Sequence, residues 1–133
     1  MNARLRPEFS APDETQSAEW WYSELLEFTH DAIIVWALGG EGIVYFNPAA
    51  ELLYGYSRDE VKGKVTHELL NTKLSTNIED VETSIARYGI WMGELTHTTR
   101  AGRDLAVKAR MILLPRMDDR WLVAEINREV ITA

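Results

Sequence analysis

The sequence contains no cysteine, and this absence removes several kinds of chemistry at once. Disulfide bonds, thiol nucleophiles, iron–sulfur clusters and thiolate zinc sites all need cysteine side chains. The sequence also lacks an apolar run near the roughly 20 residues of a membrane-spanning helix, and it begins without the apolar core of a signal peptide. We therefore expect a cytoplasmic domain with no membrane insertion of this segment.

Clusters of lysine and arginine are missing too, and the formal net charge is −7. Nucleic-acid binding depends on such clusters to neutralise phosphates, so nucleic acid is not an expected partner. Hydrophobic residues nevertheless occupy 46% of the 133 positions, which suffices for one globular domain with a substantial core.

The chain divides into four predicted parts. Residues 1–16 are polar and typical of a flexible leader, and residues 17–30 are predicted to contain a helix. Residues 31–130 carry the strand and helix patterns of a core. Residues 131–133 are predicted to start a connector to a possible output domain.

The predicted N-terminal helix is apolar on more than one side. Such a helix packs against two surfaces, here the sheet and a second chain. We therefore predict a homodimer whose interface is formed by Trp20, Trp21, Tyr22 and Leu25.

Two strand-like segments open the predicted core. Residues 32–37 and 43–46 are rich in β-branched and aromatic residues, and the glycine-rich turn between them predicts an antiparallel hairpin. Directly after the second segment, Asn47 is a suitable helix cap, and Pro48 suits the first helical position.

Further short helices are predicted after this point. Ser57–Glu60 has the pattern of a capping box, and residues 66–71 favour another helical turn. A second capping box, Thr76–Glu79, predicts a longer helix over residues 77–88 that ends at Gly89.

The last third of the chain changes to the alternation of β-strands, over residues 90–99, 104–114 and 120–129. The middle strand places charged residues on one face and an apolar set on the other. That apolar set is Leu105, Val107, Ala109, Met111 and Leu113. The predicted fold class is therefore α+β, with one five-stranded antiparallel sheet.

Six short motifs occur in an order that resembles the PAS domain family of sensory modules. They are Asp31–Ile34 (DAII), Gly42–Ala50 (GIVYFNPAA), Gly55–Ser57 (GYS), Glu60–Gly63 (EVKG), Gly89–Leu95 (GIWMGEL) and Arg100–Gly102 (RAG). The resemblance implies a five-stranded antiparallel sheet around a cavity, closed by small helices on one face, with an N-terminal helix that often mediates dimerisation.

The function implied by the resemblance is sensory and non-catalytic. Such a domain binds a small ligand or a partner and transmits a signal to an attached output domain, for example a histidine kinase of a two-component system. An alternative is a ligand-free module for dimerisation or protein interaction.

The end of the last predicted strand departs from the family pattern. Family members commonly finish it with Asp-Ile-Thr, which couples the core to the next signalling helix. This chain has Asn127–Thr132 (NREVIT), so Glu129 replaces the aspartate only with the threonine displaced by one residue. Glu129 is therefore the candidate residue for signal coupling.

No cofactor or metal is predicted. The absence of cysteine excludes a flavin–thiol adduct, and the helix over residues 77–88 lacks the axial histidine that haem-binding members carry there. His67 precedes that helix and is either a pocket ligand or an anchor of its own turn. His97 is interpreted as solvent-facing or as a cross-strand partner.

An enzyme is not predicted either, because no nucleophile motif such as G-x-S-x-G occurs. Glu94 is the best isolated carboxylate. It would either accept a hydrogen bond from a ligand or act as a base, or it would form an ion pair with Lys108 or Arg110 on the neighbouring strand.

A candidate ligand pocket follows from the apolar face of the sheet and the helices that close it. Its ligand would be small and mainly hydrophobic, although the same side chains could simply fill the core. The candidate lining residues are Val35, Leu53, Leu69, Ile78, Val81, Ile85, Trp91, Leu95, Val107, Leu113 and Ile126.

Overall fold

The computed structural model describes residues 29–40, 42–116 and 118–131 of the chain. The predicted leader lies outside the described residues. So do the residues predicted to form a dimer interface, Trp20, Trp21, Tyr22 and Leu25.

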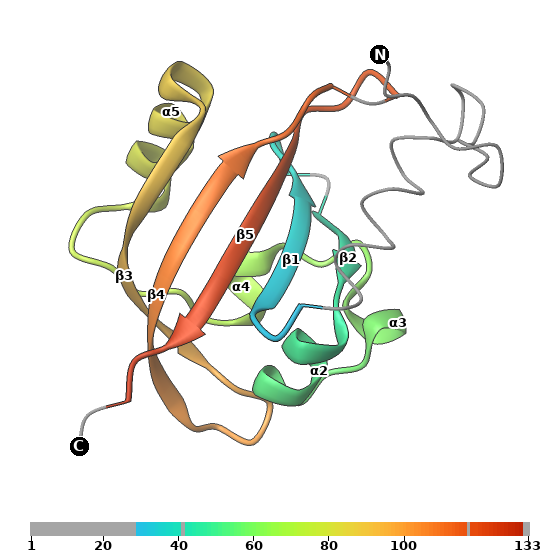
Figure 1. The fold of residues 1–133 in the computed structure, drawn as a ribbon, viewed down its shortest axis with the longest axis vertical. Helices are drawn as coiled ribbons and strands as arrows, with labels where there is room; N and C mark the ends of the chain where they lie inside the picture. Colours follow the sequence, from blue (N-terminus) through green and yellow to red (C-terminus); the bar gives the residue numbers. More distant parts are fainter. Residues whose placement is uncertain (1–28, 41, 117, 132–133) are drawn as a thin grey trace, which may run out of the picture.

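Five strands form a single antiparallel sheet, as predicted. The strands are β1 (Ala32–Ala37), β2 (Gly42–Phe46), β3 (Ile90–Thr98), β4 (Asp104–Leu113) and β5 (Leu122–Glu129). Their order across the sheet is β2-β1-β5-β4-β3, and every neighbouring pair is antiparallel (Figure 1). The last strand along the chain therefore lies at the centre of the sheet.

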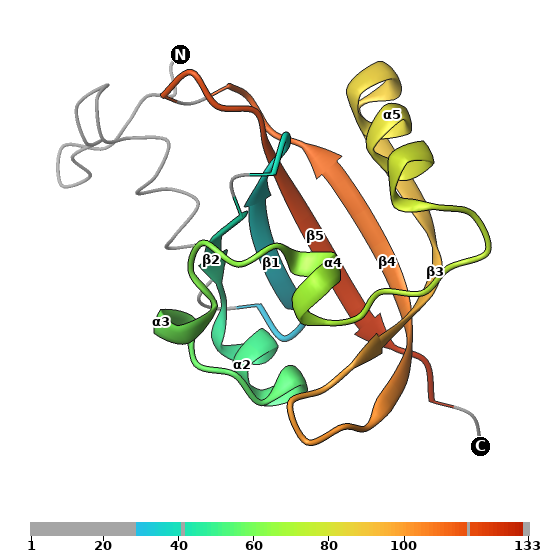
Figure 2. The ribbon, with the colours of Figure 1, turned by 180° about the vertical axis from the view of Figure 1, so that it is seen from behind.

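Within the described ranges, four helices cover one face of this sheet. They are α2 (Pro48–Tyr54), α3 (Arg58–Val61), α4 (Thr66–Leu69) and α5 (Ile78–Tyr88). From behind the view of Figure 1, α2, α3 and α4 lie in front of the strands (Figure 2). The α+β prediction of a sheet with small helices on one face is thus confirmed.

The side chain of Asn47 links the start of α2 to the start of β1 by hydrogen bonds. Its Oδ1 accepts hydrogen bonds from the backbone N–H groups of Ala50 and Ile33, both at 2.9 Å. Its Nδ2 donates to the carbonyl of Asp31, also at 2.9 Å. The predicted cap is confirmed, and it satisfies backbone groups of two elements at once.

The predicted start of α5 is wrong by one residue. The helix begins at Ile78, and its cap is Asn77, whose side chain accepts a hydrogen bond from the N–H of Asp80 at 2.8 Å. Asparagine is a better cap than threonine, so Thr76 instead donates its hydroxyl hydrogen to the Asp80 carboxylate. The capping box at Ser57 and the stop at Gly89 are confirmed.

Strand β5 starts at Leu122, two residues later than predicted. Asp118 and Asp119 adopt left-handed φ values of 50° and 60°, which extended strands do not contain. The turn before β5 therefore extends further along the chain than the composition indicates.

The sheet separates two apolar clusters. The inner cluster lies between the sheet and the helices and includes the alternating residues of β4, from Leu105 to Met111. The outer cluster, on the opposite face, is built around Ile33, Val35, Ala37 and Leu122. The alternation predicted for β4 is confirmed by this division.

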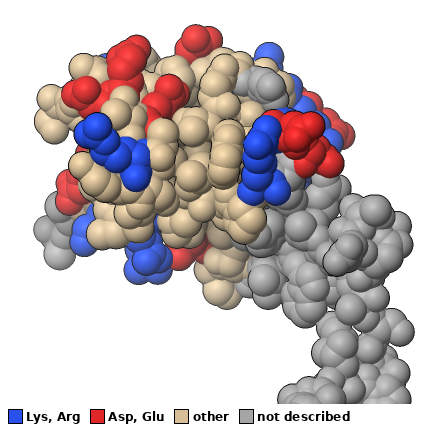
Figure 3. Space-filling view, turned by 90° about the horizontal axis from the view of Figure 1, so that it is seen from above, with Lys and Arg blue, Asp and Glu red and all other residues tan. Residues whose placement is uncertain are grey.

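Within the part of the chain that the structure describes, no helix has the length and apolar character to cross a membrane. Seen from above the view of Figure 1, uncharged side chains occupy the middle of the described surface (Figure 3). Basic and acidic side chains lie around them, so the two signs of charge are interspersed on this face.

Candidate functional site

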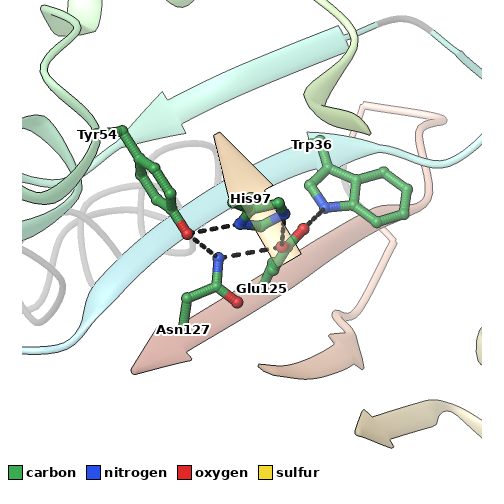
Figure 4. A network of polar contacts seen from close by, with 5 residues as sticks. All are labelled: Trp36, Tyr54, His97, Glu125 and Asn127. Atoms are coloured by element: carbon green, nitrogen blue, oxygen red, sulfur yellow. Dashed lines mark hydrogen bonds and ion pairs between the residues drawn. The ribbon is translucent and has the colours of Figure 1, made fainter. Parts of the chain in front are cut away.

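Five side chains with polar groups meet inside the inner cluster, and we call them the polar quintet. They are Trp36 from β1, Tyr54 from α2, His97 from β3, and Glu125 and Asn127 from β5 (Figure 4). All of them except Trp36 are at most 1% exposed. A glutamate is almost never buried to this extent unless it has partners, so this is the least ordinary part of the interior.

Hydrogen bonds link the polar quintet. Trp36 Nε1 donates to Glu125 Oε1 at 2.9 Å, and Asn127 Nδ2 donates to Glu125 Oε2 at 3.0 Å. Asn127 Nδ2 also donates to the Tyr54 hydroxyl oxygen at 3.0 Å, and this hydroxyl lies 2.7 Å from His97 Nδ1. The carboxylate thus receives two donors in place of water.

The hydrogen-bond partners of Tyr54 favour one tautomer of His97. The Tyr54 oxygen accepts from Asn127, and its single hydrogen has an acceptor if His97 Nδ1 carries no hydrogen; with the other tautomer this buried hydrogen would have none. A neutral imidazole that accepts at Nδ1 carries its hydrogen on Nε2. That atom lies 3.7 Å from Glu125 Oε2 and has no hydrogen-bond partner.

Burial shifts the pKa values of the three titratable members. It lowers the pKa of His97 to about 4, so this imidazole is neutral at pH 7. Burial raises the pKa of Glu125, against the opposing effect of the hydrogen bonds from Asn127 and Trp36. The pKa of Tyr54 is raised first by burial and then by the charge of Glu125. The contact between His97 and Glu125 is therefore not an ion pair at neutral pH.

A cavity of about 20 Å³ lies beside the polar quintet, and its volume corresponds to about one water molecule. Glu125 and Thr66 contribute polar groups to its wall, and the buried Thr66 hydroxyl has no hydrogen-bond partner. His67 lines the same cavity, which is far too small for a haem. Among the described residues, no group of three or more histidine, aspartate or glutamate side chains could hold a metal ion.

The sequence itself matches a family profile described as PAS domain, over residues 30–128. The chain belongs to the PAS domain family. No curated protein matches it significantly.

Solved structures of other PAS domains resemble this one. The PAS domain of a protein from Colwellia psychrerythraea has a TM-score of 0.69 at 22% identity, with 85% of this chain and 97% of that chain covered. The PAS domain of nitrogen regulation protein NR(II) from Vibrio parahaemolyticus also has a TM-score of 0.69, at 20% identity, with coverage of 82% and 97%.

A third similar structure is a domain of a sensory box sensor histidine kinase/response regulator from Geobacter sulfurreducens. It has a TM-score of 0.63 at 25% identity and covers 87% of this chain and 97% of that chain. The PAS fold is typical of sensory signalling modules, and the similar structures include a PAS domain from a two-component sensor histidine kinase.

The PAS domain brings together most residues of the predicted pocket. Ile78 lines the small cavity. Eight others belong to the inner cluster or pack against it, and they are Leu53, Leu69, Val81, Ile85, Trp91, Leu95, Val107 and Leu113.

Two residues of the predicted pocket, Val35 and Ile126, lie on the opposite face of the sheet, in the outer cluster. Neighbouring residues of a strand point to opposite faces, and the inner positions beside these two are taken by Trp36 and Glu125. Their assignment to the pocket is therefore corrected. Ile126 instead lines an open hollow of about 430 Å³ on the outer face, together with Glu94 and Lys108.

Glu129, the residue predicted to couple the signal, is the last residue of β5. Its carboxylate Oε2 accepts from Arg103 Nη1 at 3.3 Å. Glu129 has the same parity in β5 as Asn127 and lies two residues beyond it. The predicted coupling residue is thus the next residue after Asn127 on the same face of the strand.

The interpretation of His97 as solvent-facing is wrong, because its side chain is fully buried. Its parity in β3 matches that of Leu95, and its cross-strand neighbour is Leu105; both are inner residues. Glu125 and Asn127 likewise share the parity of Val123. In β3, the shared parity of His97 with the predicted pocket residue Leu95 is the signal in the sequence that could have revealed this member of the polar quintet.

Proposed function

We propose that this PAS domain is a non-catalytic regulatory module of a signalling protein, which passes a signal to an attached output domain such as a histidine kinase. The observation that carries the proposal is the polar quintet. It connects α2, β1 and β3 to β5, the central strand that ends at Glu129. A rearrangement within it would change how β5 is held by the helices.

A catalytic role for the polar quintet is disfavoured by its burial. His97, Glu125 and Tyr54 resemble groups that perform acid–base chemistry, but each is at most 1% exposed. A substrate larger than water has no room in the adjoining cavity of about 20 Å³. We therefore assign the polar quintet a regulatory role.

The proposed transmission is tested by joining residues 1–133 to the catalytic core of a histidine kinase whose own PAS domain has been removed. In a series of fusions, the junction is moved one residue at a time through one heptad, so that the PAS domain is attached to the kinase in every helical phase. We expect Asn127→Ala and Glu129→Ala to change autophosphorylation at least several-fold in the responsive fusions, while Glu94→Gln on the outer face leaves it unchanged. Equal activity of all variants in every fusion would contradict the proposal.

A ligand-free interaction module is the second candidate, and the closed interior favours it. The described residues leave about 20 Å³ beside the polar quintet, whereas an open hollow of about 430 Å³ lies on the outer face of the sheet. Native mass spectrometry of freshly purified protein separates the two. A co-purified organic ligand supports a ligand sensor, and the bare chain mass supports the interaction module.

The dimer interface and the cytoplasmic location remain proposals. We place the interface at Trp20, Trp21, Tyr22 and Leu25, because these large apolar side chains gather on one predicted helix. Trp21→Glu is expected to convert the dimer into a monomer in analytical ultracentrifugation. An unchanged sedimentation coefficient would show that the interface lies elsewhere.

A further inference from the structure

The polar quintet leaves two of its buried polar atoms without a hydrogen-bond partner, His97 Nε2 and Asn127 Oδ1. Its single acid, Glu125, is held by neutral donors, Trp36 and Asn127. The polar quintet thus contains one carboxylate, one unused hydrogen-bond donor and one unused acceptor. When a proton binds or leaves, its hydrogen bonds can therefore adopt a second arrangement.

We propose that the polar quintet is a proton-binding site, so that the ligand sensed by this PAS domain is the hydrogen ion. This inference rests on the regulatory function proposed above and names its signal.

The geometry assigns the incoming proton to Glu125. His97 has no free lone pair, because Nδ1 accepts from Tyr54 and Nε2 already carries a hydrogen. Protonation of the imidazole would break its bond with Tyr54, whereas the carboxylate oxygens have lone pairs to spare. Proton uptake therefore converts the Glu125 carboxylate into a carboxylic acid and changes the charge of the polar quintet from −1 to zero.

The new O–H group needs an acceptor, and Asn127 supplies one. A half-turn of its amide exchanges Nδ2 for Oδ1 at a position 3.0 Å from both Glu125 Oε2 and the Tyr54 oxygen. The amide oxygen then accepts from both groups. Since Tyr54 now donates to Asn127, His97 must donate to Tyr54 from Nδ1, and its hydrogen moves from Nε2 to Nδ1. One added proton thus reverses every bond that runs from Asn127 through Tyr54 to His97.

Few titratable side chains face Glu125 among the described residues. Glu82 of α5 and His67 of α4 line the small cavity with it, and Glu129 follows on the same face of β5, paired with Arg103. Of the described titratable side chains of α2 and β3, Tyr54 and His97 face Glu125, whereas Glu94 lines the outer hollow. Strands β1 and β4 present no other titratable side chain to this face within the described residues, because the inner residues of β4 are apolar. Burial of the carboxylate raises the pKa of Glu125 and so favours the protonated acid.

The test is a pH titration of the labelled chain, residues 1–133, by nuclear magnetic resonance. The reporters are the Trp36 indole N–H, which touches the carboxylate, and the ring nitrogens of His97. Both should follow one single-proton transition, with a midpoint above the ordinary range of a carboxyl group. His97 should carry its hydrogen on Nε2 above the midpoint and on Nδ1 below it.

Glu125→Gln should abolish the Trp36 transition, and the surface control Glu94→Gln should leave it intact. A Trp36 signal that is constant wherever the chain is folded, or that moves equally in E125Q, would overturn the proton site. A transition with a constant His97 tautomer would overturn the reversal. If E125Q does not fold, Trp36→Phe replaces it: loss of this donor should raise the midpoint seen at His97, and an unchanged midpoint would refute the assignment to Glu125.

The same spectra keep this inference separate from the proposed function. Backbone signals of residues 128–131 should shift with the Trp36 midpoint when the proton signal reaches the end of β5. A Trp36 transition without such shifts would support the proton site and contradict transmission through β5. An absent transition contradicts the proton site alone, because the histidine kinase chimera tests transmission independently.

Discussion

Strands β4 and β5 are neighbours in the sheet, yet their two faces have opposite polarity. β4 turns apolar residues such as Val107 inward and charged residues such as Lys108 outward. β5 turns Glu125 and Asn127 inward and Ile126 outward. An ordinary amphipathic strand thus lies beside an inverted one, and the inverted strand builds the candidate site.

Burial is made possible in two different ways within this one interior. Val107 is stabilised by its removal from water, whereas Glu125 tolerates removal only because Trp36 and Asn127 replace its water molecules. Substitutions in the two strands should therefore destabilise the domain for different physical reasons.

A charge in the ordinary strand should have the largest effect. Val107→Asp places an unpartnered carboxylate at a fully buried position, which should cost about 5 kcal/mol or more and unfold the domain. Urea denaturation followed by circular dichroism measures this. The control Lys108→Asp, on the exposed face of the same strand, should stay folded. A cooperative unfolding transition of V107D near that of the wild type would show that β4 also tolerates an inward charge.

Loss of a hydrogen-bond donor in the inverted strand should cause the second-largest loss of stability. Asn127→Ala removes one donor from the buried carboxylate and one from Tyr54, which should cost about 3–5 kcal/mol. The free energy of unfolding in urea is the measurement. A cost below about 1 kcal/mol would mean that the hydrogen bonds of the polar quintet contribute little to stability.

The pH dependence of stability should reveal the buried titratable residues at the inverted strand, because the ordinary strand turns none inward. The pKa of His97 is about 4 in the folded protein and about 6.5 unfolded, so the unfolded chain binds more protons between these values. The contribution of neutral, buried His97 to the free energy of unfolding is complete above pH 6.5, and it decreases by about 3 kcal/mol as the pH falls to 4. The raised pKa of Glu125 acts with the opposite sign, since its stabilising contribution is lost as the pH rises above the unfolded value.

Urea denaturation at a series of pH values checks this third prediction in matched variants. His97→Gln should remove the gain in stability between pH 4 and 6.5. Glu125→Gln should make the same gain steeper, because the opposing contribution has gone. Parallel pH profiles of the wild type and both variants would refute the roles assigned to the two residues.

A surface pair on the outer side of β5 should give the smallest effect. Arg128 forms a two-pronged ion pair with Asp31, at 3.2 and 3.1 Å, but its side chain is 73% exposed. Arg128→Ala should therefore change the free energy of unfolding very little, and the small difference should disappear in 1 M salt. A cost similar to that of Asn127→Ala would mean that the two faces of β5 contribute equally.

The sequence predicts the ordinary strand and the helix ends well, because their signals are local. Alternation is enough to orient β4, Asn47 and Pro48 are enough to start α2, and Gly89 is enough to end α5. The predicted start of α5 differs from the structure by one residue, because Asn77 and Thr76 are both suitable caps.

The inverted strand could not be predicted in the same way. The assumption that apolar residues face the core assigns Ile126 to the pocket and leaves Glu125 outside. Glu125 becomes an inner residue only once Trp36 of β1 is adjacent to it, and the two lie 89 positions apart in the sequence. Polar interiors depend on such distant partners, which the pattern of a single strand does not contain.

The ion pair between Asp31 and Arg128 has a mechanical consequence. Asp31 immediately precedes β1 and Arg128 lies near the end of β5, and these antiparallel strands are paired from Ala32–Asn127 to Ala37–Leu122. The chain thus enters and leaves the sheet at the same end. A force that pulls these two points apart would unzip the β1–β5 ladder one pair at a time, starting at the ion pair, instead of shearing all its hydrogen bonds together.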